Sequence, residues 1–279
     1  MKIFTGNVKE KCAFVSVMST DDYLPGLLVL HESLISTNTK YPFLVLLTKN
    51  ISPKVVSIIE SQCISYKVID KEINNPTDVE RNHRWFPTYS KLNVFDQTQY
   101  EKIVYLDVDI IILRNIDELF EHKHMSATNA GGMLPRKSSW VHLNSGVFIL
   151  EPSRVLFEDM INKVGKIEKL KSMGTFERPQ YGSDQDFLNA YYPNWPQQSD
   201  LHLDHKYNIF HYYLDEYNEI FGYTIEDSVK PISILHYASY LKPWNMTKSE
   251  QDELFNDPKR KLESEAVKIW LDAYSRIKS

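Results

Sequence analysis

The sequence predicts an α/β protein with a single Rossmann-like domain, in which a mostly parallel sheet is covered by helices. Short apolar runs, typical of buried strands, alternate with longer segments of helical periodicity, and this alternation is typical of a doubly wound sheet. The chain has 279 residues, of which 42% are hydrophobic. That is enough for one large core, and the chain is too short for two large domains.

The first part of the chain supplies most of the predicted sheet. Three strands are expected, at 13–18, 43–48 and 66–70. A turn over 19–26 and a helix over 27–37 separate the first two strands. Ser52 reads as a helix N-cap and Pro53 as the first helical residue, so a second helix follows the second strand.

The remaining elements are less regular. A helix is expected around Ser90–Gln97, followed by a fourth strand within 101–113. A strand over 144–152, at an edge or antiparallel, precedes an amphipathic helix over 155–173. Residues 174–235 are rich in Tyr, Trp and Pro and predict loops and short helices over one end of the sheet.

The composition changes near residue 245, where a charged helical pattern begins. We therefore divide the chain into a main domain, 1–248, and a C-terminal helical extension, 249–279. This boundary is the one place where the sequence predicts a division.

Composition excludes several classes of function. The formal net charge is −5, which argues against nucleic-acid binding, because a nucleic-acid surface needs a basic footprint. The sequence contains no membrane span, and charged residues near the N-terminus argue against a signal peptide. Cys12 and Cys63 lie in apolar surroundings and are predicted to be buried thiols. Reduced cysteines favour a cytoplasmic location.

Two carboxylates interrupt the fourth predicted strand. Asp107 and Asp109 are two residues apart in "EKIVYLDVDIIIL", so in a strand they would project from the same face. Two like charges in an apolar setting need compensation, and a divalent cation such as Mg²⁺ or Mn²⁺ would supply it. The alternative is that Asp107 ends one strand, Asp109 begins a turn, and both are solvated.

Six segments resemble, in order, the motifs of family 8 glycosyltransferases, the retaining enzymes that include glycogenin. They are "AFVSVMSTDDYLPGLLVLHESL", "TYSKL", "YLDVDIIILRNIDELF", "LNSGVFILEPS", "GSDQDFLNAYY" and "LHYASYLKPWN". The resemblance extends over residues 13–245 and implies the GT-A type of nucleotide-sugar-binding fold. It makes 1–248 the catalytic domain.

The resemblance implies how the donor and its metal ion are held. Asp107, Asp109 and His236 would be the ligands of Mn²⁺ or Mg²⁺, and Lys242 would pair with the diphosphate of a UDP-sugar. The remaining donor-binding positions are Ser19, Thr20, Tyr23, Lys91, Val108, Asn144, Ser145 and Ser239. Ser239 replaces a family glycine, and Thr20 stands where glycogenins usually have Asn.

The resemblance also implies the groups at the transferred sugar. Asp184 would orient the sugar, and Gln185 would stabilise the positive charge that develops at the anomeric carbon. The family offers no obvious carboxylate nucleophile for a double displacement, so the resemblance implies a front-face mechanism. Two family aspartates are missing: Tyr181 stands in one place, and Asn129 or Ala130 in the other. Acceptor specificity is therefore expected to differ from that of glycogenin.

The preferred prediction is a metal-dependent retaining transferase that moves a hexose, glucose or galactose, from a UDP-sugar to a glycan or protein acceptor. One alternative is a self-glucosylating primer, for which Tyr212 is the nearest candidate acceptor. Others are a nucleotide-sugar-binding protein without turnover and a nucleotidyltransferase. The chain lacks a G-x-x-x-x-G-K loop, which argues against a P-loop enzyme. A homodimer is possible, because many relatives pair.

Overall fold

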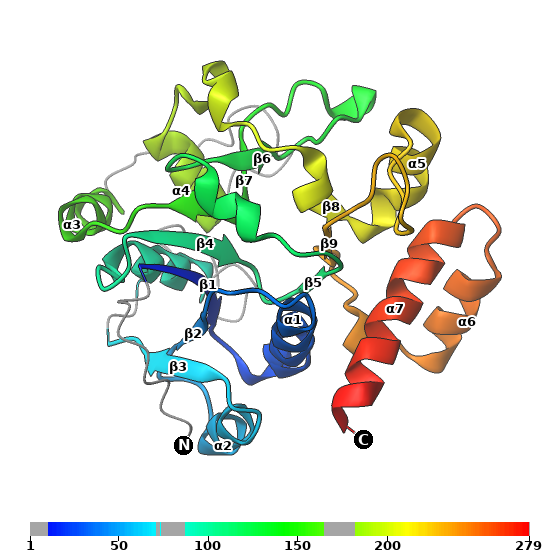
Figure 1. The fold of residues 1–279 in the computed structure, drawn as a ribbon, viewed down its shortest axis with the longest axis horizontal. Helices are drawn as coiled ribbons and strands as arrows, with labels where there is room; N and C mark the ends of the chain where they lie inside the picture. The colour runs from blue at the N-terminus through cyan, green and yellow to red at the C-terminus, as the bar shows by residue number, and fades with distance from the viewer. Residues whose placement is uncertain (1–10, 71–72, 74–86, 165–181, 279) are drawn as a thin grey trace.

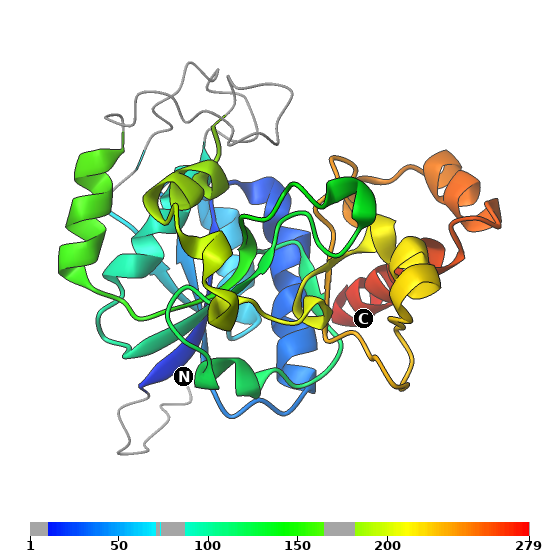
Figure 2. The same cartoon turned by 90° about the horizontal axis from the view of Figure 1, so that it is seen from above.

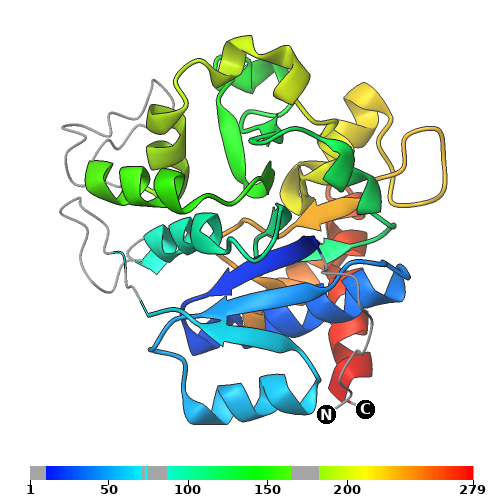
Figure 3. The ribbon, with the colours of Figure 1, turned by 60° about the vertical axis from the view of Figure 1, so that its left-hand side comes forward.

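The computed structural model describes residues 11–70, 73, 87–164 and 182–278, and it confirms the predicted α/β class (Figure 1). A six-stranded sheet with the order β3-β2-β1-β4-β7-β6 forms the centre. Its strands are β1 (Cys12–Met18), β2 (Phe43–Leu47), β3 (Ser65–Val68), β4 (Lys102–Leu106), β6 (Ala127–Asn129) and β7 (Leu143–Leu150). The first four in the chain are parallel, and Figure 3 shows β1, β2 and β3 as neighbouring arrows.

Helices cover both faces of this sheet. The helices in the described part of the chain are α1 (Leu24–Ser36), α2 (Pro53–Ser61), α3 (Arg154–Lys163), α4 (Asp184–Tyr191), α5 (Leu214–Phe221), α6 (Lys248–Asn256) and α7 (Lys261–Lys278), of which α1 to α4 pack on the two faces. Phe14 of β1 packs with α1 and α2, while Ala13 and Val15 pack with α3 and α4 on the opposite face. Because both faces are buried, β1 is continuously apolar rather than alternating.

The run 101–113 forms two strands instead of the predicted one. β4 ends at Leu106, and β5 (Ile110–Ile112) belongs to a second, three-stranded sheet with β9 (Ile234–His236) and β8 (Ile209–Phe210). Asp107 and Asp109 therefore lie on the turn between two sheets, and the argument that both share one strand face was wrong. The apolar pattern continues through the turn because β5 is also buried.

Other elements differ from the prediction mainly in type and extent. The predicted helix at Ser90–Gln97 is a 3₁₀ helix over Pro87–Asp96. β7 is antiparallel, which was one of the two predicted alternatives, but it lies between β4 and β6 rather than at an edge. Of the predicted helix over 155–173, Arg154–Lys163 is helical, and 165–173 lies outside the described residues.

The prediction that both cysteines are buried was wrong. Cys12 is half-buried at the start of β1, and Cys63 is exposed. Cys63 occupies the turn after α2, where its backbone adopts a left-handed conformation (φ 55°) and its N–H donates to the carbonyl of Glu60 at 3.0 Å. The apolar neighbours of Cys63 in the sequence belong to α2 and to the following strand region, so they do not enclose the turn itself.

The C-terminal helices pack on the rest of the protein. Figures 1 and 2 both show α7 beside α1, and these two helices are in contact. Trp270 and Ala266 of α7 are buried in a cluster that also contains Val29 of α1 and Leu235 of β9. The division of the chain at residue 248 stays a prediction, and the two sides of it share this cluster.

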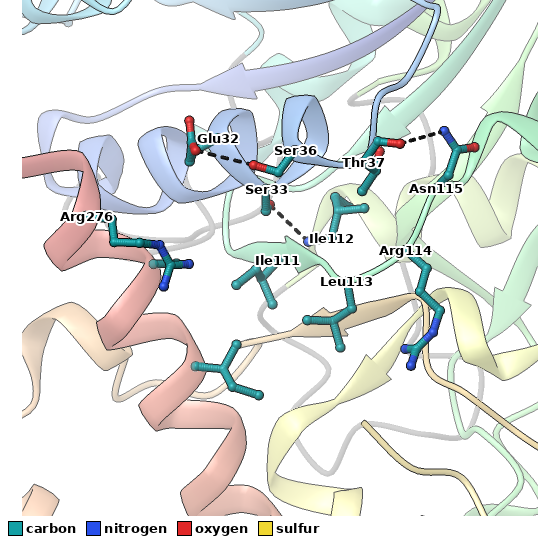
Figure 4. A pocket seen from close by; sticks show the side chains of 12 residues that line it. Glu32, Ser33, Ser36, Thr37, Ile111, Ile112, Leu113, Arg114, Asn115 and Arg276 are labelled. Atoms are coloured by element: carbon teal, nitrogen blue, oxygen red, sulfur yellow. Dashed lines mark hydrogen bonds between the residues drawn. The ribbon is translucent and has the colours of Figure 1, made fainter. Parts of the chain in front are cut away.

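A pocket of about 270 Å³ lies between α1, β5 and α7 (Figure 4). Glu32 and Ser33 line it from α1, Ile111 from β5 and Arg276 from α7. None of the predicted site residues is among its lining residues. No helix in the described residues is long and apolar enough to cross a membrane.

Asp215 on α5 caps the N-terminus of α7, and this contact gives a testable prediction. Its carboxylate accepts hydrogen bonds from the backbone N–H groups of Leu262 (2.9 Å) and Glu263 (3.0 Å) at the start of α7. Asp215→Ala leaves these donors without their acceptor and removes a negative charge from the positive end of the helix dipole. We expect a loss of about 1–2 kcal/mol in the free energy of unfolding.

Urea unfolding monitored by circular dichroism measures this loss. Asp272→Ala, an exposed carboxylate later in α7, is the matched control and should change the unfolding free energy by less than about 0.5 kcal/mol. Equal stabilities for the two variants would mean that Asp215 does not cap α7.

Candidate functional site

Asp107, Asp109 and His236 come together at the junction of the two sheets. Asp107 follows β4, and its backbone N–H donates to the carbonyl of Gly146 on β7 at 2.8 Å. β5 and β9 pair with Ile110 opposite His236, which places the imidazole beside the turn that carries Asp109. One ligand atom from each of the three side chains lies within 4.8 Å of the others. The three predicted metal ligands therefore form one cluster.

Asp109 is buried and paired with two basic groups. Its Oδ2 accepts a hydrogen bond from Nζ of Lys242 at 2.5 Å, and its Oδ1 lies 3.2 Å from Nε2 of His236. Burial alone would raise the pKa of Asp109, but Lys242 and His236 lower it by more, and the pKa lies well below its ordinary value. Asp109 is therefore a carboxylate at neutral pH, as a metal ligand must be.

Lys91 neutralises the other side of the site. Its Nζ lies 3.1 Å from Oδ1 of Asp107 and 2.7 Å from Oδ2 of Asp184, and it donates to the carbonyl of Ser145 at 3.0 Å. Burial lowers the pKa of the Lys91 ammonium, but Asp107 and Asp184 raise it by more, so the pKa lies above its ordinary value. Lys91 is thus a fixed buried cation between two carboxylates from distant segments.

Asp107 differs from Asp109 in its electrostatics. Burial and the neighbouring Asp109 raise the pKa of Asp107 above its ordinary value, although Lys91 and His236 oppose the rise. The hydroxyl of Tyr105 donates to Oδ1 of Asp107 at 2.7 Å. Asp107 is less fully compensated by basic groups than Asp109, and a cation bound beside both carboxylates would lower its pKa.

Asn208 fixes the orientation and the proton of the His236 ring, and the sequence did not predict it. Its Nδ2 donates to Oδ1 of Asn144 (2.7 Å), so its Oδ1 is the atom that accepts from Nδ1–H of His236 (2.9 Å). Nε2 of His236 then faces Oδ1 of Asp109 at 3.2 Å. Two such acceptor atoms repel each other at this distance unless a proton or a cation lies between them.

These features show that the three side chains fit a divalent metal ion. Two carboxylates and a neutral imidazole, whose other nitrogen is held by an outer hydrogen bond, are a donor set that Mn²⁺ and Mg²⁺ accept. Gly146 brings the backbone of β7 against the ring, since a Cβ there would lie 2.6 Å from Cε1 of His236. The glycine therefore leaves room for the imidazole in this position.

Two of the predicted sugar-contacting residues, Ser145 and Asp184, contact Lys91. Asp184 begins α4, where Ser183 and Asp186 form a capping box, so the cap and the predicted functional role of this segment coexist. Ser145 joins the two parts: its Oγ donates to Oδ2 of Asp184 (2.8 Å), and its N–H donates to Oε1 of Gln185 (3.1 Å). Asp184, Gln185 and Ser145 thus form a single hydrogen-bonded group.

The predicted uridine-binding residues lie at the carboxyl end of β1. Ser19 and Thr20 follow that strand, and the carbonyl of Ser19 accepts from Thr48 Oγ1 at 3.1 Å. The ring of Tyr23 lies 5.8 Å from Nζ of Lys242. Ser239 closes the turn before Lys242 by donating from its Oγ to the carbonyl of Leu241 at 2.6 Å. Tyr23 therefore lies close to Lys242, whereas no contact joins Thr20 to the three metal ligands within the described residues.

Val108 packs this turn against α1. A Cβ at Gly26 in the first turn of α1 would lie 2.4 Å from the carbonyl oxygen of Val108, so glycine is required for the close approach. Tyr212 lies in a 3₁₀ turn ahead of α5, and Asn129 and Ala130 end β6 and begin the following loop. Tyr181 lies outside the described residues.

Comparison with known proteins identifies the family. The sequence model of glycosyl transferase family 8 matches residues 14–248. The chain belongs to this family. Glycogenin-1 of Mus musculus is 28% identical to this family 8 glycosyltransferase and aligns with 94% of it and 75% of its own length. An uncharacterised protein, R707, of Acanthamoeba polyphaga mimivirus is 31% identical over 95% of the chain and 94% of its own length.

Other relatives carry different names. Inositol phosphorylceramide glucuronosyltransferase 1 of Arabidopsis thaliana is 33% identical over 68% of this family 8 glycosyltransferase, which spans 32% of that relative's length. Among solved structures, the galactosyltransferase LgtC, with donor and acceptor sugar analogues, has a TM-score of 0.61 at 16% identity and 95% coverage of both chains. This likeness confirms the predicted GT-A fold.

Removal of one carboxylate tests the metal centre. Asp109→Asn keeps the shape of the side chain but removes its negative charge, so we expect Mn²⁺ affinity to fall by at least roughly 100-fold and metal-dependent turnover by orders of magnitude. Paramagnetic resonance of free Mn²⁺ measures the affinity without an activity assay. Asp70→Asn, whose side chain is fully exposed, is the control. Unchanged Mn²⁺ binding by Asp109→Asn would contradict the site.

Asn208 gives a separate prediction about His236. Asn208→Ala removes the acceptor for Nδ1–H of His236, so the ring loses its fixed tautomer, and we expect Mn²⁺ affinity to fall roughly 10-fold. Asn208→Asp retains an acceptor for that proton and should recover part of the loss. If both variants bind Mn²⁺ as the wild type does, Asn208 does not orient the ring.

Proposed function

We propose that this family 8 glycosyltransferase transfers a hexose from a UDP-sugar to a glycan or protein acceptor with retention of configuration, using Mn²⁺ or Mg²⁺. The observation that carries the proposal is the convergence of Asp107, Asp109 and His236 within 4.8 Å, with Lys91 and Lys242 on either side. Two carboxylates, one imidazole and two ammonium groups suit a metal-bound diphosphate. They do not suit a neutral ligand.

The two lysines have different tasks in this proposal. Lys242, beside Asp109 and 5.8 Å from the ring of Tyr23, lies between the metal ligands and the predicted uridine site. It would neutralise the diphosphate as negative charge develops on the departing UDP. When bound, the metal ion would supply Lewis-acid stabilisation to the same leaving group. Lys91, held by Asp107 and Asp184, would stand between the diphosphate and the sugar.

Asp184 and Gln185 are the proposed catalytic residues. Asp184 is held by Lys91 and Ser145, so its carboxylate is fixed and suited to accept hydrogen bonds from hydroxyls of the transferred sugar. The amide oxygen of Gln185 is the group we assign to the developing positive charge at the anomeric carbon. Because an amide is a weak nucleophile, this assignment favours departure of UDP and attack of the acceptor on the same face.

Donor binding and turnover are tested together by calorimetry and a hydrolysis panel. We expect UDP to bind only with Mn²⁺ or Mg²⁺ present, and one of UDP-glucose and UDP-galactose to be hydrolysed fastest. UDP-N-acetylglucosamine and UDP-glucuronate complete the panel, since one relative is named a glucuronosyltransferase. Preference for either of them would overturn the hexose donor. UDP binding without any hydrolysis or transfer would favour a binding protein.

Two variants sharpen this experiment. Lys242→Ala should weaken UDP binding by roughly 10-fold or more, since a charge-assisted contact is lost, while the order of preferred sugars stays the same. Gln185→Ala should reduce turnover by roughly 100-fold with UDP affinity retained. Intact mass after incubation with donor alone tests the primer alternative, for which added hexose would have to disappear in Tyr212→Phe.

A further inference from the structure

A strip of half-buried and exposed aromatic and basic side chains extends from the metal centre to the loop that precedes β7. We call it the aromatic–basic strip. Its members come from the 131–142 loop, from the end of β8 and from the segment between β8 and α5, and they are Arg136, Lys137, Trp140, Phe210, Tyr212 and Tyr213. None of these residues, except Tyr212 as a possible self-acceptor, has a role in the donor site described above.

The strip begins at a metal ligand. The ring of Phe210 lies 5.1 Å from the imidazole of His236, edge to face. Phe210 in turn lies 5.6 Å from the ring of Tyr212 and 6.2 Å from that of Tyr213. A continuous row of rings therefore starts at the cluster that would hold the diphosphate and its metal ion.

Two cations continue the row. The guanidinium of Arg136 lies 4.8 Å from the ring centre of Tyr213, and Nζ of Lys137 lies 5.6 Å from the same ring and 5.2 Å from that of Trp140. Arg136 is paired with Glu216. Among the residues that the structure describes, no carboxylate pairs with Lys137. The strip thus has one surplus positive charge, held by aromatic rings.

The loop that carries these cations is fixed in place. Its base is closed by two backbone hydrogen bonds, from Gly131 to the carbonyl of Trp140 (2.8 Å) and from Ala130 to that of His142 (2.7 Å). A third anchor joins it to α5, where the hydroxyl of Tyr217 accepts from the N–H of Met133 at 2.9 Å. A surface held in this way loses little conformational entropy when a ligand binds.

The position of the loop connects the strip to the transferred sugar. The loop leads directly into β7, whose first residues include Asn144 and Ser145, and Ser145 is bonded to Asp184 and Gln185. One end of the strip therefore contacts the metal ligand His236, and the loop at the other end continues in the chain into the strand that carries the proposed sugar contacts. A chain of sugar units could lie along the strip while its end reaches the reaction centre.

We propose that the aromatic–basic strip is the acceptor subsite and that it selects a saccharide with a negatively charged group, such as a uronate or a phosphate. Aromatic rings provide flat apolar surfaces against which the C–H faces of sugar rings can pack. Lys137 provides the charge for the anion. This inference rests on the proposed function, because it names the acceptor class of the same site.

Binding of matched disaccharides tests the strip. The protein, with UDP and Mn²⁺, is titrated in a calorimeter with three disaccharides of one linkage that end in glucose, glucuronate or glucose 6-phosphate. We expect at least one of the anionic disaccharides to bind about tenfold more tightly than the neutral one, the factor typical of one charge-assisted contact. Whichever anion binds more tightly identifies the charged group. Equal affinities, or no binding of any of the three, would overturn the proposal.

Substitutions assign the effect to the strip. Lys137→Gln should bring the three affinities to within about twofold of one another. Lys268→Gln, another lysine over an aromatic ring (4.6 Å from Phe255) but on α7, should keep the preference. Trp140→Ala should weaken all three disaccharides, and Trp140→Phe should restore most of the loss. An anionic preference that survives Lys137→Gln would overturn the assignment.

UDP affinity measured on the same samples separates the two proposals. If the wild type does not bind UDP but still prefers the anionic disaccharides, the donor assignment is overturned and the strip remains a saccharide site. Normal UDP binding without anionic preference would overturn the strip alone.

Discussion

The site depends on buried and half-buried charges that neutralise one another. Lys91 lies between Asp107 and Asp184, and Lys242 lies against Asp109. Each of these groups would be costly to bury alone, and removing one partner of such a pair leaves an uncompensated charge. The five side chains come from a 3₁₀ helix, the turn after β4, the start of α4 and the segment after β9. The fold is therefore the means by which the charges reach their partners.

This dependence explains why the site lies where two sheets meet. Within one sheet, successive strands offer a row of carboxyl ends, and the groups on them point the same way. Here the chain leaves the large sheet after β4 and enters the small one at β5, and the small sheet returns His236 to the turn. The sequence comparison shows the family, and the structural likeness shows the fold. The choice of donor sugar and acceptor depends on side chains beyond those that build the two sheets.

Much of the sheet and its helices could be predicted from the sequence. The buried runs of β1 and β2 and the Ser52 cap of α2 were predicted correctly, because they depend on local pattern. The end of a strand at Asp107 was one of the two alternatives, but the change of sheet after it could not be predicted, since it depends on β9, far along the chain. The exposure of Cys63 was missed for a related reason: the apolar residues near it in the sequence, Ile59 and Ile64, are buried, but its own turn is not.

The predicted metal ligands were found together, and that prediction rested on resemblance rather than on strand periodicity. Asn208 had no signal of its own, because an asparagine before a short apolar pair is common in loops. Its importance appears only from its contacts with His236 and Asn144. The role of a residue that holds a metal ligand in place follows from its contacts in the folded chain, so a single sequence without coordinates does not reveal it.

The pairing of β5 with β9 also protects the site against misfolding. Ile234 and His236 share one face of β9, whereas Leu235 points into the cluster that holds Trp270. A slip of one residue in this pairing would direct Leu235 toward the carboxylates and drive the imidazole into that apolar cluster. Any chain that misaligned its catalytic strand would thereby forfeit part of its core, so correct assembly of the ion-binding groups is enforced by hydrophobic packing.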